Sequence, residues 1–139
     1  MARLNVYFSH STKFDYKNIL YKKILSSPVC LAQNLILPMS EENKSKYIKD
    51  LINEADIIIV NLSNPNFWHK LELKWILKAN KPTLYVSDDN ILPKTYKKLV
   101  PNFTLTDDNN TYISVIENFI KQNLELKEAK DKPQVLGEI

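Results

Sequence analysis

The sequence predicts an α/β three-layer sandwich built around a five-stranded parallel sheet. Residues 56–60 (DIIIV) and 84–86 (LYV) are short, mostly apolar runs, which are typical of strands buried on both faces. Residues 67–79 lie between them and carry apolar side chains at the spacing of an amphipathic helix. A strand, a helix and a second strand form a βαβ unit, whose two strands are parallel. The rest of the chain adds strands and helices to this unit.

The central unit has recognisable boundaries. Its first strand extends over residues 56–62 and its helix over residues 67–79. Pro65 stands at a plausible helix start, and Asn80-Lys81-Pro82 ends the helix. The side chains expected to form the apolar stripe of this helix are Phe67, Trp68, Leu71, Trp75 and Ile76.

The amino-terminal part supplies two strands and two helices. Residues 4–8 form the first strand, residues 9–12 a polar loop after it, and residues 33–37 the second strand. Asp15 or Thr12 is expected to cap a helix over residues 14–26, and Ser40 opens the next helix with Glu41 and Glu42 in its first turn. The expected inward side chains are Ile19, Leu20, Ile24 and Leu25 in the first helix and Tyr47, Ile48, Leu51 and Ile52 in the second, with Asp50 solvated.

The carboxyl-terminal part completes the sheet. A polar loop over residues 87–90 follows the fourth strand, and its adjacent Asp88 and Asp89 are more typical of a solvated turn than of a metal site. Residues 96–100 form a short helix or an irregular piece, residues 102–106 the fifth strand and residues 111–126 a closing helix. The expected inward side chains of that helix are Tyr112, Ile113, Ile116, Phe119 and Ile120.

These elements predict one domain over residues 1–124, followed by a charged carboxyl-terminal tail over residues 125–139. Val135, Leu136 and Ile139 either dock this tail on the domain or on another subunit, or belong to a frayed terminus. We expect the flavodoxin-like strand order 2-1-3-4-5. Ligands of such sheets bind beyond the carboxyl ends of the strands, so the loop over residues 9–12 is a candidate contact. Alternatively, its hydroxyls only satisfy the turn.

The composition narrows the class of protein. The 139 residues are 44% hydrophobic and 25% charged, as in ordinary globular proteins. A single Cys30 excludes an intramolecular disulfide framework, and with two histidines it leaves little for a zinc site. Neither a membrane-spanning run nor a signal peptide is recognisable, so we expect a cytoplasmic protein. The net charge of +3 is scattered along the chain, which makes nucleic-acid binding an unfavoured interpretation.

Glu72 is the most informative residue of the central helix. Positions three and four residues away hold aromatic or apolar residues and one imidazole, and no lysine for a surface ion pair. Partial burial there would raise the pKa of Glu72 and strengthen its interaction with positive charge that develops on a ligand. The alternative is a glutamate at the rim of a mostly solvated helix.

The segment around Glu72 resembles the nucleoside 2-deoxyribosyltransferases. Residues 70–76 (KLELKWI), with Lys81-Pro82 and a strand after them, are similar to that family's G-x-E-x-G-[YW]-A segment. The Glu of that segment is the family's nucleophile on the sugar C1′. Residues 6–9 (VYFS) are similar to its first strand, whose Tyr orients the Glu. The resemblance implies these roles for Glu72 and Tyr7.

A second resemblance overlaps the first. Residues 68–73 (WHKLEL) resemble the W-C-x-x-E-L of TIR domains, whose Glu serves NAD cleavage in the members that are enzymes. Residues 63–67 are similar to the TIR segment that leads into that helix, and residues 8–11 are similar to the end of the TIR first strand. Together the two resemblances span roughly residues 3 to 87 and imply the same flavodoxin-like topology.

The sequence departs from the transferase pattern at several positions. Lys70 and Lys74 stand where the family has glycines, and the single glycine of the chain is Gly137. Ser63 or Asn64 replaces an acidic residue that often follows the third strand in the family. Because a glycine lets backbone approach a ligand closely, these differences predict a reshaped or narrower pocket.

The resemblances imply an N-glycosyl transferase or hydrolase that acts on a nucleoside or nucleotide, with NAD cleavage of the TIR type as the alternative. Cleavage at C1′ passes through an oxocarbenium-like state, which an adjacent carboxylate stabilises. No metal or other cofactor is implied, and self-association is expected by analogy. The expected substrate-binding residues are Ser9, His10, Ser11, Ser63, Trp68 and Trp75.

A different class of function stays open at this point. The chain is alternatively a non-catalytic nucleotide-sensing or interaction module that has kept the fold without turnover. Lys70 and Lys74 favour this alternative, because two cations beside the site suit a phosphate better than a neutral nucleoside.

Overall fold

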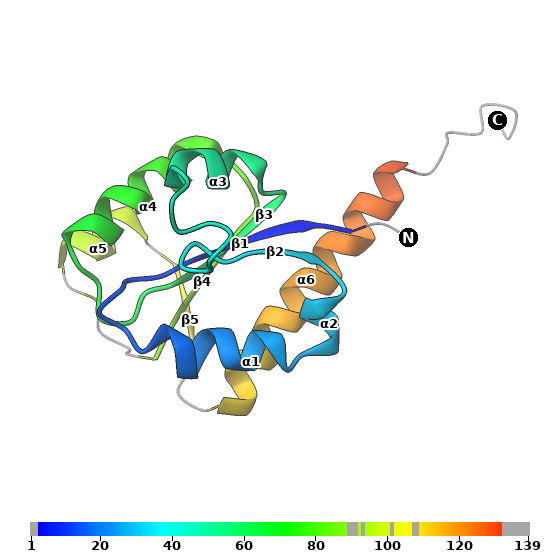
Figure 1. The fold of residues 1–139 in the computed structure, drawn as a ribbon, viewed down its shortest axis with the longest axis horizontal. Coiled ribbons are helices and arrows are strands. Elements are labelled where there is room, and N and C mark those ends of the chain that lie inside the picture. Colours follow the sequence, from blue (N-terminus) through cyan, green and yellow to red (C-terminus); the bar gives the residue numbers. More distant parts are fainter. Residues whose placement is uncertain (1–2, 89–91, 93, 101, 107–108, 132–139) are drawn as a thin grey trace, which may run out of the picture.

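The computed structural model describes residues 3–88, 92, 94–100, 102–106 and 109–131. Its five strands form one parallel sheet in the order β2-β1-β3-β4-β5, which confirms the predicted flavodoxin-like order (Figure 1). β1 lies inside the sheet and pairs with both β2 and β3. The strands are β1 (Asn5–Ser9), β2 (Asn34–Ile36), β3 (Ile57–Asn61), β4 (Thr83–Ser87) and β5 (Thr104–Leu105).

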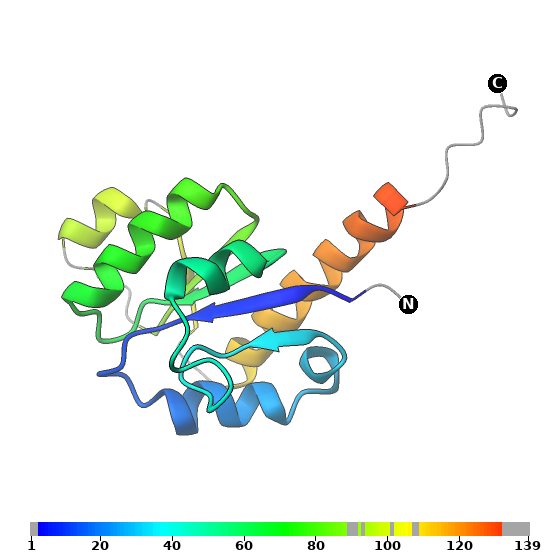
Figure 2. The ribbon, with the colours of Figure 1, turned by 45° about the horizontal axis from the view of Figure 1, so that its top comes forward.

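Helices cover both faces of the sheet, so the molecule has three layers (Figures 1 and 2). One face carries the π-helical segment η1 (Lys17–Tyr21), α1 (Lys22–Leu25), α2 (Pro28–Leu31) and α6 (Asn109–Asp131). The other face carries α3 (Ile48–Glu54), α4 (Phe67–Ala79) and α5 (Lys94–Leu99).

The alternation of β3 explains its unbroken apolar sequence. All five of its residues are buried. Ile57 and Ile59 belong to the core beneath α1, α2 and α6, whereas Ile58 and Val60 belong to the core beneath α3 and α4. Each fully buried aliphatic side chain contributes about 1.5–3 kcal/mol through the area that it removes from water. A strand between two cores therefore needs apolar residues at successive positions.

The first helix differs from its prediction. It begins with a π-helical segment, and no side chain caps it, so neither Asp15 nor Thr12 acts as the expected cap. Asp15 instead accepts hydrogen bonds from the Asn18 side chain. Leu20 and Ile24 are buried as predicted, but Ile19 and Leu25 are exposed. The predicted row of inward apolar side chains was therefore wider than the face of this helix that packs against the sheet.

The second helix begins later than predicted. Ser40 donates through its hydroxyl to Leu37 O at 2.8 Å, and Asn43 donates to the same carbonyl at 3.1 Å. These side chains stabilise turns instead of capping a helix, and α3 begins at Ile48. Leu51 and Ile52 are buried, Ile48 packs at the edge of their core, and Asp50 is exposed as expected. Tyr47, expected inside, is 81% exposed.

The bounds of α4 agree with the prediction, but its buried stripe agrees only in part: Ile76 is buried and Trp75 packs against the core, as expected. The buried residues are His69, Glu72, Leu73 and Ile76. Phe67 and Trp68, expected inside, are more than 70% exposed. The helix is capped by Asn66, whose Oδ1 accepts from the backbone N–H of His69 at 2.9 Å. It ends at Asn80, which adopts a left-handed conformation with φ 51°.

The carboxyl-terminal elements also differ in length from their predictions. β5 has two residues instead of five, and α6 continues to Asp131, so residues 125–131 of the predicted tail are helical. Tyr112, Ile116 and Ile120 are buried, and Ile113 and Phe119 pack against them. Val135, Leu136, Ile139, Asp89 and Asn90 lie outside the described residues. Within the described part of the chain, no helix is both long and apolar enough to cross a membrane.

Candidate functional site

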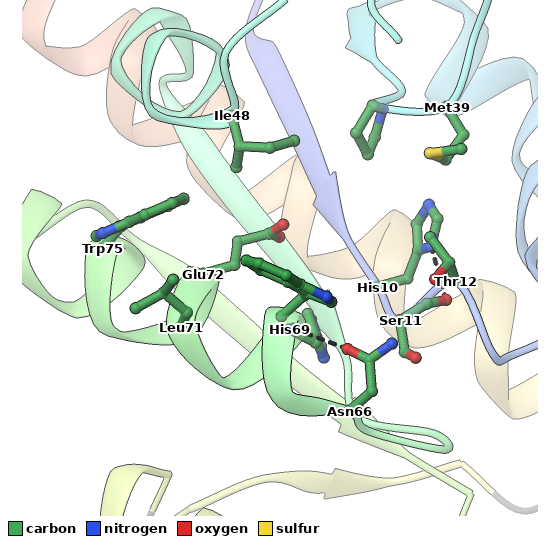
Figure 3. A pocket seen from close by; sticks show the side chains of 12 residues that line it. His10, Ser11, Thr12, Met39, Ile48, Asn66, His69, Leu71, Glu72 and Trp75 are labelled. Atoms are coloured by element: carbon green, nitrogen blue, oxygen red, sulfur yellow. Dashed lines mark hydrogen bonds between the residues drawn. The ribbon is translucent and has the colours of Figure 1, made fainter.

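A cavity of about 230 Å³ opens beyond the carboxyl ends of β1 and β2, against the amino-terminal half of α4. This is the edge where the strand order reverses between β1 and β3, and ligands of such sheets bind there. Figure 3 shows that the cavity walls come from different elements. The lining residues are His10, Ser11 and Thr12 after β1, Pro38 and Met39 after β2, Ile48 of α3, Asn66, and Trp68, His69, Leu71, Glu72 and Trp75 of α4.

Glu72 presents its carboxyl group at the base of this cavity. Its side chain is directed into the space between Ile48 and His10 (Figure 3), and the residue is 9% exposed. Glu72 Oε2 accepts a hydrogen bond from Tyr7 OH at 3.1 Å and a second, short one from Ser9 Oγ. Among the described residues, no hydrogen bond reaches Oε1. One carboxyl oxygen is thus held by two hydroxyl donors, and the other is left for a ligand.

Burial and hydrogen bonding shift the pKa of the Glu72 carboxyl group in opposite directions. Burial raises the pKa of Glu72 from 4.5 to about 7, although the hydrogen bonds from Ser9 and Tyr7 lower it. The same burial, together with the charge of Glu72, raises the pKa of Tyr7 well above its ordinary value. Tyr7 therefore stays protonated and remains a hydrogen-bond donor at neutral pH, whereas Glu72 is divided between its protonated and ionised forms at that pH.

His69 is a buried neighbour of Glu72 to which the sequence analysis assigned no role. Its Nε2 lies 2.9 Å from Ser9 Oγ, and its Nδ1 is buried without a hydrogen-bond partner in the structure. Burial lowers the pKa of His69 to about 4, so the ring is neutral at pH 7. Its position three residues before Glu72 was the signal for a shared helix face.

His10 forms a rigid, uncharged wall of the cavity. Its Nδ1–H donates to Ser11 O at 3.1 Å, and its Nε2 accepts from Tyr21 OH at 2.7 Å. The ring stacks on Tyr16, with 4.6 Å between the ring centroids. Burial lowers the pKa of His10 to about 4. Ser11 lines the cavity beside it and accepts from the Lys13 backbone N–H at 3.1 Å.

The two tryptophans lie at different depths. Trp68 lines the cavity but is 73% exposed, and its ring contacts Phe67 edge-on with 5.5 Å between centroids. Trp75 is half-buried, and the Lys49 ammonium lies 4.9 Å from its ring centroid. Ile48 and Trp75 also line an adjoining groove, whose other walls are Lys46, Tyr47, Lys49 and Asp50. A ligand longer than the cavity can extend into this groove.

The structure does not bring every expected residue to the cavity. Ser63 Oγ donates to Asp88 Oδ1 at 2.8 Å, and Ser63 does not line the cavity. Lys70 and Lys74 do not line it either, so the cations that favoured a phosphate site are on other faces of α4. Asn66, Pro38 and Met39 are lining residues that the sequence analysis did not identify.

The donor set indicates which chemistry the site can perform. Within the described residues, no three His, Cys, Asp or Glu side chains gather closely enough to hold a metal ion. Glu72 and His69 line the cavity, whereas the hydroxyls of Tyr7 and Ser9 are fully buried behind Glu72 and do not line it, although Ser9 was expected to bind substrate. A carboxyl group with one free oxygen can attack, or electrostatically stabilise, an electron-poor carbon.

Comparisons with known proteins found similar structures but no similar sequence. No protein-family model and no curated protein matches the sequence. The structure is similar to the CMP N-glycosidase BcmB of Clostridium botulinum, with a TM-score of 0.58 and 13% identity over 81% of this chain and 98% of that chain. It is also similar to the TIR domains of the activated Roq1 resistosome, with a TM-score of 0.53 and 14% identity over 88% and 76% of the respective chains. At these identities the likeness shows a shared fold.

Proposed function

We propose that this protein cleaves or transfers the N-glycosidic bond of a nucleoside or nucleotide, with Glu72 as the nucleophile. The observation that carries the proposal is the asymmetric carboxyl group of Glu72. Tyr7 and Ser9 hold Oε2, whereas Oε1 has no hydrogen bond from the described residues, and Glu72 lines a cavity at the edge of the sheet where ligands of such folds bind. Two fixed donors on one oxygen orient the other toward a reacting carbon.

The proposed reaction has two steps. Glu72 Oε1 forms a bond to C1′ as the bond from C1′ to the base nitrogen breaks, and the bonding electron pair leaves with the base. The oxocarbenium-like transition state is stabilised by the negative charge of the carboxylate. Water or a second base then attacks C1′, the bond from C1′ to Glu72 breaks and Glu72 leaves as the carboxylate. The proton lost by the attacking group is taken up by the departed base. Trp68 or Trp75, which line the cavity, offer faces for stacking a base.

NAD cleavage is the second candidate, and the shape of the site supports it. The cavity of about 230 Å³ is smaller than the roughly 300–1,000 Å³ of ordinary small-molecule sites. It adjoins the groove lined by Lys46, Lys49 and Asp50, where the two ammonium groups outnumber the single carboxylate and would attract a dinucleotide's pyrophosphate. The alternative of a non-catalytic module loses part of its basis, because Lys70 and Lys74 do not line the cavity. Self-association and a cytoplasmic location stay predictions.

A product assay tests the proposal directly. Purified protein is incubated with ribo- and deoxynucleosides, their 5′-monophosphates and NAD, with and without a second free base, and released base or nicotinamide is quantified. Glu72→Gln keeps the size of the side chain and removes the nucleophile, so its product should fall to background. Glu42→Gln, an exposed glutamate, is the matched control and should keep full activity. Product that persists in Glu72→Gln would refute the assigned nucleophile.

A further inference from the structure

His69 is close to the reacting carboxyl group without touching it, and Ser9 lies between them. Ser9 Oγ contacts Glu72 Oε2 and lies 2.9 Å from His69 Nε2. We infer that His69 is a positioning residue: its Nε2–H fixes the Ser9 hydroxyl so that Ser9 donates to Glu72 and favours the ionised carboxylate. This inference rests on the proposed function for its catalytic consequence.

The direction of this hydrogen-bond chain follows from the number of hydrogens. The Ser9 hydroxyl has one hydrogen, and an ionised carboxylate can only accept. Ser9 therefore donates to Glu72, and its contact with His69 is a hydrogen bond when Nε2 carries the ring hydrogen. A neutral imidazole carries one N–H, which leaves Nδ1 as a bare acceptor.

The surroundings of Nδ1 favour that direction. Nδ1 is buried and has no partner in the structure. If Glu72 were protonated and donated to Ser9, Ser9 would donate to Nε2, and the ring hydrogen would have to move to Nδ1. A buried N–H without an acceptor is rarer and more costly than an acceptor with an unused lone pair. The environment of His69 thus disfavours the chain that accompanies a neutral Glu72.

The imidazole is well fixed for this role. His69 is 2% exposed, and Asn66 anchors its backbone N–H, as the dashed line in Figure 3 shows. Tyr96 OH in turn donates to Asn66 O at 2.8 Å. These two bonds fix the backbone at His69, and the close packing of its buried side chain leaves the ring little room to turn Nε2 away from Ser9.

Other titratable groups around Glu72 do not replace His69. Tyr7 donates to the same carboxyl oxygen from β1, and His10 and Tyr21 lie across the cavity and bond to each other. The described cavity lining contains no lysine or arginine. No full positive charge from the described cavity lining therefore stabilises the carboxylate. Its ionised form depends instead on the neutral hydrogen-bond donors around it.

The test is the pH dependence of kcat/KM in His69→Leu, His69→Gln and the parent protein. The acid limb is the part of the profile in which kcat/KM rises with pH. His69→Leu should move this limb upward by about one pH unit, so that kcat/KM falls tenfold at pH 6 and is unchanged above pH 9. His69→Gln supplies a side-chain N–H and should restore the limb. Ser9→Ala should move the acid limb upward by a similar amount. The double variant Ser9→Ala/His69→Leu should show no larger displacement than Ser9→Ala alone. A uniform loss at every pH, or an unmoved limb, would overturn the inference.

A second readout does not require turnover. The pKa of Glu72 is obtained from the pH dependence of unfolding, by comparing each protein with its Glu72→Gln derivative. If no substrate is turned over but His69→Leu raises the pKa of Glu72, the proposed function fails and the positioning role stands. If product forms and this pKa is the same with and without His69, the positioning role fails and the proposed function stands.

Discussion

Removal of the Glu72 charge should change stability in a way that depends on pH. Burial raises the pKa of Glu72 from 4.5 to about 7. The folded protein therefore holds a proton between these values that the unfolded chain has lost. Stability falls as pH rises through this window, because unfolding lets the carboxyl group ionise in water. A shift of about 2.5 pH units corresponds to about 3 kcal/mol.

Glu72→Gln isolates this contribution, because the amide does not titrate. The free energy of unfolding of Glu72→Gln minus that of the parent protein should increase by about 3 kcal/mol between pH 4 and pH 8, so that the variant gains stability relative to the parent. His10 and His69 have pKa values lowered to about 4, so they add stability as pH rises from 4 to 6.5. These opposing contributions are present in both proteins and cancel in the difference.

The assay is urea unfolding of both proteins at half-unit steps from pH 4 to pH 8.5. Glu42→Gln, at an exposed position, is the control and should show no such pH-dependent gain. A difference between Glu72→Gln and the parent that stays constant across this range would mean that Glu72 titrates as in water. That result would refute the burial argument for the site.

Three further predictions concern activity. Tyr7→Phe removes one donor from Glu72 Oε2, so kcat/KM should fall by about 10- to 100-fold at pH 7 and the acid limb should move upward. In the parent protein, kcat/KM should rise with pH, be half-maximal near pH 7 and reach a plateau above about pH 8, because the nucleophile must be ionised; a profile that falls through that range would indicate an acid instead. Lys49→Ala should raise KM severalfold for nucleoside monophosphates and leave KM for nucleosides unchanged, as measured by initial rates in low salt.

The parts of the fold that follow from periodicity were predictable. β3 and α4 were recognised because an apolar strand and a capped helix carry local signals. The predicted α3 was too long, because Ser40 resembles a helix cap but its hydroxyl bonds back to Leu37 O. Such competition between turn and helix is decided by tertiary packing, which one sequence does not display.

The site was only partly predictable for a related reason. Glu72 and Tyr7 were identified by resemblance, and their contact is present in the structure. Ser63 was expected in the cavity because it follows a strand, but its hydroxyl bonds to Asp88. Met39 was overlooked because its contribution depends on the turns before α3. Sequence position identifies the edge of a sheet, whereas loop conformation decides which side chains reach the cavity.

Two different periodicities meet at Glu72, and this explains how the fold tolerates a buried carboxyl group. Alternation along β1 directs Tyr7 and Ser9 to the face covered by α4, while Val6 and Phe8 enter the opposite core. Helical spacing in α4 places His69 and Glu72 on one face, which meets that strand. The cost of burying the Glu72 carboxylate is thus offset in part by the hydroxyls of Tyr7 and Ser9, which lie two residues apart on β1 and so point to the same face of the sheet. A Tyr-x-Ser strand opposite a His-x-x-Glu helix is therefore one structural unit, and changing either half should alter the proton affinity of Glu72.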